Sequence, residues 1–205
     1  TRQSERTRFQ QLRQQGHRSG GRPNVSLSDY IAPVGTPDWL GGFCVTAGLE
    51  MDEKLKAFSK DFDDYSSILF KALADRLAES CAEWLHHRVR TVEWGYEATS
   101  DINNTDLIAE KYQGIRPAPG YPACPEHTQK MALFELLSVQ DNIGVSLTES
   151  MAMMPAASVS GWYFAHPQAK YFGIGKIQRD QLADYAKRCG MSIEEAERWL
   201  SANLL

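Results

Sequence analysis

Hydrophobic residues recur at helical spacing over the longest regular stretch of the chain. Between Asp63 and Val89 the apolar positions fall three or four residues apart, which predicts one long helix with an apolar face toward the core. Asp63 or Asp64 stands at the start of this pattern, where a carboxylate can cap the first free N–H groups. The positions expected on the buried face are Ile68, Leu69, Ala72, Leu73, Leu77, Leu85 and Val89.

Apolar patterns on either side of this helix predict strands and a further helix. The segment Gly41–Gly48 combines β-branched and small residues as a buried strand does, and residues 52–62 read as a short helix. Residues 158–164 alternate as a strand. After a short turn, residues 170–175 are expected to return beside them as a hairpin, which places Tyr171 on the return strand.

The remaining elements are predicted to be helices. They are expected from Asn104 or Thr105 to Tyr112, from Pro125 onward with Met131, Leu133, Phe134, Leu136 and Leu137 mostly buried, at 178–189 before Gly190, and from Ser192 to about Leu200. Ser192 and Glu195 have the spacing of a capping box. Strands and helices without regular alternation indicate an α+β domain, with a twisted antiparallel sheet and flanking helices.

The composition indicates one globular domain without membrane contact. Its 205 residues are 42% hydrophobic and 23% charged, which is enough for a single buried core. No apolar run approaches the roughly 20 residues that a membrane-spanning helix requires, so no membrane partner is expected. The four cysteines are scattered, with no CxxC pair, which favours a reduced cytoplasmic compartment.

The beginning of the chain is basic, whereas the chain as a whole carries a net charge of −4. The arginines of this segment are Arg2, Arg6, Arg8, Arg13, Arg18 and Arg22, against a single acidic residue, Glu5. A basic stretch that is also rich in Gln, Gly and Ser is typically solvated, so no nucleic-acid partner is expected. We therefore divide the chain into a basic arm at 1–25, flexible or the remnant of a longer region, and a domain at 26–205.

No metal site is expected from the sequence. His86 and His87 are neighbours on the predicted long helix, where successive side chains point about 100° apart and cannot hold one ion. The methionines Met151, Met153 and Met154 are more typical of core packing than of a ligand set.

The segment Arg116–Thr128 contains four prolines, which exclude it from an interior helix or a central strand. Proline restrains its own backbone and that of the preceding residue, so the segment predicts a rigid loop. Such a loop can hold the Arg116 guanidinium in place for a ligand, or it can simply connect two helices. Glu79 and Glu83 lie one turn apart on the polar face of the long helix, where either can point into a site or into solvent.

Four ordered stretches together identify a family. They read DDYSSILFKALADRLAESCAEWLHHRVR from Asp63, YQGIRPAPGYPACPEHT from Tyr112, LTESMAMMPAASVSGWYFAHPQAKYF from Leu147 and IQRDQLADYAKRCGMSIEEAERWL from Ile177. This set resembles the C-terminal activation domain of cobalamin-dependent methionine synthase, and the resemblance covers residues 26–204. It implies a methionine synthase activation-domain-like fold and binding of S-adenosylmethionine.

The resemblance also implies roles for individual residues. A guanidinium can grip the ligand carboxylate through two charge-assisted hydrogen bonds, and acidic side chains favour its cationic groups. The positions carried over as ligand contacts are Glu79, Glu110, Arg116, Ala118 and Tyr171, with Phe172 beside the last. Tyr121 and His127, next to the loop, are expected to face cobalamin. No residue is assigned a catalytic role, because the cofactor performs the chemistry in this family.

The function implied by the resemblance is repair of a methyltransferase. The domain would present S-adenosylmethionine for reductive methylation of cob(II)alamin, with the electron supplied by flavodoxin or a related reductase. Nothing here resembles the family's cobalamin-binding DxHxxG motif, so cobalamin is expected on a different domain or chain, and methionine turnover by this chain alone is not expected. The family's N-terminal DWTPFF-like segment is also missing. The chain therefore reads as a fragment or as a shortened protein, and a non-catalytic module that docks on a cobalamin domain or flavodoxin remains the alternative.

Overall fold

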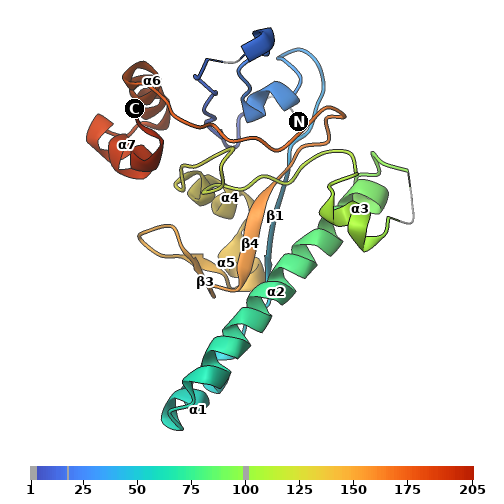
Figure 1. Cartoon of the computed structure of the whole chain (residues 1–205), viewed down its shortest axis with the longest axis vertical. Coiled ribbons are helices and arrows are strands. Elements are labelled where there is room, and N and C mark those ends of the chain that lie inside the picture. The colour runs from blue at the N-terminus through green and yellow to red at the C-terminus, as the bar shows by residue number, and fades with distance from the viewer. Residues whose placement is uncertain (1–3, 18, 99–101) are drawn as a thin grey trace.

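The computed structural model describes residues 4–17, 19–98 and 102–205 of the chain. The helices are α1 Met51–Lys60, α2 Asp64–Arg88, α3 Asn104–Ile108, α4 Gln129–Leu137, α5 Val139–Ile143, α6 Arg179–Cys189 and α7 Ile193–Leu200, and the strands are β1 Gly41–Thr46, β2 Ser146–Leu147, β3 Met153–Met154 and β4 Ser158–Tyr163. Short 3-10 or π turns occupy Ser19–Gly21, Leu27–Tyr30, Val89–Glu93 and Ser201–Asn203. Figure 1 shows α2 running beside the β1–β4 ribbon, with α1 at one end and α6 and α7 toward the other.

The predicted α+β class with antiparallel pairing is confirmed, although the sheets are small. β1 pairs with β4 in an antiparallel register from Gly41 opposite Tyr163 to Thr46 opposite Ser158. β2 and β3 form a second two-stranded sheet. The predicted hairpin between β4 and residues 170–175 is wrong. Those residues form no strand, and Tyr171 lies on an irregular segment instead.

The second edge of β4 is occupied by the proline-rich loop, which explains why no return strand forms there. Ile115 and Phe164 exchange two backbone hydrogen bonds of 3.0 Å, and the Trp162 N–H donates to the Pro117 carbonyl at 2.9 Å. The close approach requires a glycine, because a Cβ on Gly161 would lie 2.6 Å from the Pro117 oxygen. The loop is therefore fixed to the ribbon along its first residues.

The long helix α2 contacts the ribbon through small side chains. Its N-cap is Asp63, one of the two residues predicted for this position, with a side chain that accepts from the Ser66 N–H at 2.9 Å. Its buried positions recur every four residues and are Ala74, Ala78, Ala82 and His86. Methyl groups let the helix approach closely, and the rings of Phe43 and Tyr163 fill the interface against Ala82.

The predicted apolar face of α2 is therefore largely wrong. Leu85 and Val89 pack against the ribbon as expected. Ile68, Leu73 and Leu77, however, are between 54% and 68% exposed, because the alanine side of the helix faces the core. We call the residues Ile68, Leu69, Leu73 and Leu77 the α2 stripe.

Because Ala78 is buried and Leu73 is exposed, a substitution at Ala78 should reduce stability more than a substitution at Leu73. Replacing Leu73 with glutamine should change the free energy of unfolding by no more than about 0.5 kcal/mol, since the side chain is exposed. Replacing Ala78 with leucine should lower it by about 1–3 kcal/mol, because the extra atoms have no space against the ribbon. Urea denaturation of both variants measures the difference. Equal losses would mean that the α2 stripe is covered in solution.

Two larger clusters form the rest of the core. One surrounds Trp162 and joins Leu27, Leu133 and Phe164 beneath the proline-rich loop. The other lies between α6 and α7 and includes Ile177, Leu182, Tyr185, Ala196 and Leu200. These clusters hold the loop between the ribbon and the C-terminal helix pair.

The basic segment packs against the body, so its described part is not a solvated tail. Leu12 is buried in the cluster between α6 and α7. Arg13 donates twice to the Asp29 carboxylate, at 2.6 Å each, and the Gln10 N–H donates to the Gln129 side chain at 2.8 Å. An apolar anchor and side-chain hydrogen bonds thus order this segment despite its polar composition. Arg2 and Arg18 lie outside the described residues.

The predicted helix ends are partly confirmed. Gly190 ends α6 in the left-handed conformation, and the Ser192 side chain caps α7 by accepting from the Glu195 N–H at 3.1 Å. α3 ends at Ile108 instead of Tyr112. α4 begins only at Gln129, because the buried Glu126 carboxylate accepts from both the N–H and the hydroxyl of Thr128 in place of a first turn at Pro125. Of the face predicted for α4, Leu133 and Phe134 are buried, whereas Met131 and Leu136 are exposed.

The described residues also bear on the expectations for membrane helices, metal ligands and cysteines. Within this part of the chain, no helix has the length and apolar character needed to cross a membrane. Across residues 4–17, 19–98 and 102–205, no group of three histidine, cysteine or carboxylate side chains is placed to hold a metal ion. The four cysteines are free thiols, and burial raises the pKa of Cys124.

Candidate functional site

Tight turns shape the loop that carries Arg116. The Gly120 N–H donates to the Cys124 carbonyl at 2.7 Å, and the Cys124 N–H donates to the Tyr121 carbonyl at 2.9 Å. Gly120 has a φ of 93°, and a Cβ there would lie 2.2 Å from the His127 ring. The sequence thus combines prolines, which restrict the chain, with one glycine where the turn has no room for a side chain.

A pocket of about 500 Å³ opens between this loop, α2 and the segment around Tyr171. All six residues predicted to contact S-adenosylmethionine line it, together with Tyr121. The complete lining is Phe43, Glu79, Glu110, Arg116, Pro117, Ala118, Tyr121, Pro122, Ala123, Val159, Tyr171 and Phe172. Most of these residues are apolar, and the charged ones are few and convergent, which is the usual make-up of a small-molecule site.

Arg116 is held at the wall of this pocket by three side chains. Its Nη2 donates to Glu83 Oε2 at 2.7 Å, and its Nη1 lies 3.2 Å from His86 Nδ1 and 3.4 Å from the Tyr112 hydroxyl. The Arg116 side chain is 19% exposed. Burial lowers the pKa of Arg116, but Glu83, Tyr171 and Tyr112 together raise it by more, so the net pKa is raised and the guanidinium stays charged.

His86 acts as a neutral hydrogen-bond acceptor for this arginine. It is fully buried, stacked on Tyr163 with ring centroids 5.2 Å apart. Burial, followed by the charges of Arg90 and Arg116, lowers the pKa of His86 from 6.5 to about 2. Because a guanidinium has no acceptor, we assign the ring proton to Nε2, which then faces the Tyr96 hydroxyl at 3.4 Å.

A second buried arginine lies behind the first. Arg90 is fully buried, donates to Glu97 at 2.7 Å and sits 4.0 Å over the Tyr112 ring. Glu97 also accepts from the Gln113 N–H at 3.1 Å. This pair connects the π turn after α2 to the chain just before Arg116, and so fixes where the loop begins.

Two carboxylates stand in the same pocket as Arg116. Glu79 comes from α2, one turn before Glu83. Glu110 lies two residues after the end of α3, and its backbone is left-handed with a φ of 53°. The Tyr171 hydroxyl accepts from the Arg116 backbone N–H at 2.9 Å. This hydrogen bond joins the segment around Tyr171 to the loop at the pocket. Acidic and basic groups therefore face one cavity from three separate parts of the chain.

The two residues predicted to face cobalamin have different surroundings. Tyr121 is exposed at the edge of the pocket. His127 is half-buried beneath Gly120, 3.1 Å from the buried Lys130 ammonium, and is not a lining residue. Burial, followed by the Lys130 charge, lowers the pKa of His127. A role toward cobalamin stays a prediction for both residues.

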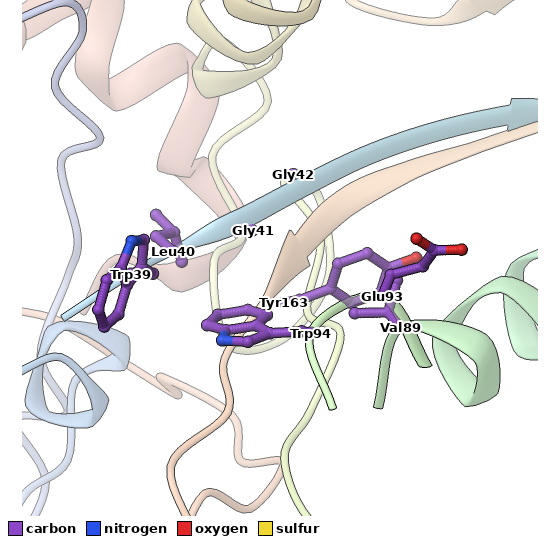
Figure 2. A pocket seen from close by; sticks show the side chains of 8 residues that line it. All are labelled: Trp39, Leu40, Gly41, Gly42, Val89, Glu93, Trp94 and Tyr163. Atoms are coloured by element: carbon purple, nitrogen blue, oxygen red, sulfur yellow. The ribbon is translucent and has the colours of Figure 1, made fainter. Parts of the chain in front are cut away.

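A second pocket, of about 600 Å³, lies elsewhere on the ribbon. Figure 2 shows Trp39, Trp94 and Tyr163 around the first residues of β1, with Glu93 at one side. The Glu93 carboxylate is paired with Arg88 at 2.6 Å. This pocket is larger, yet it has no converging set of opposite charges, so we take the Arg116 pocket as the candidate site.

Three residues of the site were not assigned to it from the sequence. Glu83 was one of two glutamates that could point into a site, and the structure directs it to Arg116. His86 was considered only as a metal ligand, although its place three residues after Glu83 puts both on one helix face. Phe43 lines the pocket from β1. The β-branched and small residues around it indicated a buried strand without indicating a site.

The buried neutral histidine predicts a loss of stability in mild acid. The unfolded chain binds a proton at His86 below pH 6.5, whereas the folded chain does not until about pH 2. The stabilisation is therefore complete above pH 6.5 and falls by about 1.4 kcal/mol per pH unit below it. Melting temperatures from pH 7.5 to 5 measure this slope. His86→Gln should flatten it, whereas His17→Gln, at an exposed position, should not; equal slopes would contradict the assignment.

Comparison with known proteins shows the family of this chain. A profile described as vitamin B12 dependent methionine synthase, activation domain, matches residues 1–190. The chain belongs to this family of activation domains. It is similar to a solved structure, the crystal structure of the MetH reactivation domain bound to AdoHcy, with 57% sequence identity and a TM-score of 0.91.

The extent of this similarity differs between the two chains. The match covers 95% of this chain and 60% of the MetH chain. The family and the fold expected from the four sequence stretches are thus confirmed. The roles assigned to the individual pocket residues remain predictions.

Proposed function

We propose that this chain binds S-adenosylmethionine in the Arg116 pocket and presents its methyl group for the reactivation of cobalamin-dependent methionine synthase. The observation that carries the proposal is the convergence of Glu79, Glu110, Arg116, Tyr171 and Phe172 on one cavity. The volume of about 500 Å³ suits a nucleoside bearing an amino acid, since small-molecule sites span roughly 300–1,000 Å³.

The chemistry of the pocket matches each part of the ligand. The Arg116 guanidinium would bind the carboxylate, and Glu79 and Glu110 would favour the ammonium and sulfonium groups. Tyr171 and Phe172 would pack against the ribose and adenine, with loop backbone at Ala118 for the adenine edge. The related MetH domain was solved with AdoHcy, which is S-adenosylmethionine without its methyl group.

The methyl acceptor would be cobalamin held by a different domain or chain. When bound on that domain or chain, cobalamin would supply the methyl-accepting centre, and flavodoxin or a related reductase is the proposed electron donor. This chain binds and orients the sulfonium, keeps the methyl group accessible, and releases AdoHcy afterwards. Tyr121, exposed at the pocket edge, and His127, half-buried beneath Gly120, are both proposed to face the corrin.

Calorimetric titration of the chain with S-adenosylmethionine tests the proposal. We expect saturable binding to one site, accompanied by a higher melting temperature in excess ligand. Absence of both heat and thermal stabilisation would contradict it. A module that only docks on a cobalamin domain or flavodoxin would then be the better explanation.

A further inference from the structure

The contacts of Arg116 leave a particular part of its guanidinium for a ligand. A guanidinium has five N–H donors. Both Nη1 hydrogens face protein acceptors, His86 Nδ1 and the Tyr112 hydroxyl, and one Nη2 hydrogen faces Glu83. The remaining donors are Nε–H and the second Nη2 hydrogen. The edge of a guanidinium that carries Nε–H and one Nη2 hydrogen can bind both oxygens of a carboxylate.

We infer that Glu83 is a positioning residue that holds Arg116 with this edge presented to the ligand carboxylate. The inference rests on the proposed function. Glu83 is not among the residues that line the pocket, so it acts through Arg116 rather than on the ligand. His86 supports the same orientation from the other nitrogen, because its neutral ring can only accept there.

Glu83 has two opposing effects on the affinity for the ligand. Its negative charge opposes that of a ligand carboxylate, so it could weaken binding. The ligand's ammonium is attached to the same carbon as that carboxylate, however, and largely cancels the repulsion. What remains is the ordering of a long side chain before binding, an advantage of up to about tenfold in affinity. We therefore expect Glu83 to strengthen binding.

A pair of ligands separates this role from a structural one. AdoHcy and 5′-methylthioadenosine share the adenine, ribose and thioether, but 5′-methylthioadenosine has no amino-acid end. Glu83→Ala should weaken AdoHcy binding by about tenfold and change binding of 5′-methylthioadenosine by less than about twofold. Glu83→Gln keeps an oxygen acceptor for Nη2 and should recover most of the lost affinity. Glu53→Ala, on the exposed face of α1, is the matched control and should leave both ligands unaffected.

Each alternative result has a separate meaning. If the wild-type chain binds neither ligand, the proposed function fails and the inference fails with it. If Glu83→Ala weakens both ligands equally, the function stands, but Glu83 merely supports the fold and the inference is overturned. If Glu83→Ala tightens AdoHcy binding, the carboxylate competes with the ligand for Arg116, which also overturns it.

Discussion

Replacing Arg116 with alanine is expected to weaken AdoHcy and S-adenosylmethionine binding by about 30- to 1,000-fold. Under the proposed function, the variant would lose two parallel charge-assisted hydrogen bonds to the ligand carboxylate, worth about 2–4 kcal/mol. It also leaves Glu83 without its partner in a partly buried position, so the free energy of unfolding should fall by about 1–2 kcal/mol. Titration calorimetry and urea denaturation measure the two losses separately.

Lysine at the same position provides the control. Arg116→Lys keeps the charge but lacks the planar edge, so it should recover only part of the affinity. Binding that is equal in wild type, Arg116→Ala and Arg116→Lys would show that the carboxylate is held elsewhere. A variant that binds normally but melts far below wild type would show that Arg116 serves the fold alone.

Replacing Gly161 with alanine is expected to damage both stability and binding. The added Cβ would lie 2.6 Å from the Pro117 carbonyl, 3.1 Å from the Phe43 ring and 3.3 Å from Ala118 Cβ. All three neighbours line the pocket. The contacting Pro117 oxygen belongs to the backbone and cannot move away by a change of side-chain rotamer. The added Cβ therefore forces the loop away from β4. We expect a loss of about 3 kcal/mol in the free energy of unfolding, and AdoHcy affinity reduced by at least about tenfold.

A glycine in open surroundings gives the comparison for this variant. Gly16 has no atom within 4 Å of an added Cβ, so Gly16→Ala should leave stability and binding close to wild type. Thermal melting and AdoHcy titration of both variants complete the test. If Gly161→Ala folds and binds like Gly16→Ala, the loop is not fixed to β4 in the way described here.

Local sequence patterns predicted the helices and strands of this fold better than they predicted which segments pair with one another. The strands β1 and β4, the cap at Asp63 and the end of α6 at Gly190 are decided by neighbouring residues, and the structure has all of them. The partner of β4 depends on contacts between distant segments. Ile115 and Pro117 occupy the edge where residues 170–175 were expected, and a loop with four prolines gives no strand pattern to indicate this.

The pocket shows the same division between local and distant information. Periodicity placed Glu79 and Glu83 on one face of α2, but it could not say which contacts Arg116. The family resemblance brought Glu79, Arg116 and Tyr171 to one ligand, and the structure places all three on one cavity. Burial of α2 was misjudged because large apolar residues were counted as core. A helix packed closely against a ribbon instead buries its smallest residues, here Ala78 and Ala82.

The small size of those two alanines also bears on the width of the candidate pocket. Glu79 and Glu83 approach the loop from α2, while Phe43 faces them from β1, so the separation between helix and ribbon sets the separation between the pocket walls. Ala82 packs against Phe43 and Tyr163 with a single methyl group, and Ala78, one turn earlier, is buried as well. Under the proposed function, selectivity for the size of the ligand would depend partly on residues outside the pocket lining. Enlarging either alanine should widen the pocket, whereas changes along the exposed α2 stripe should leave its dimensions as they are.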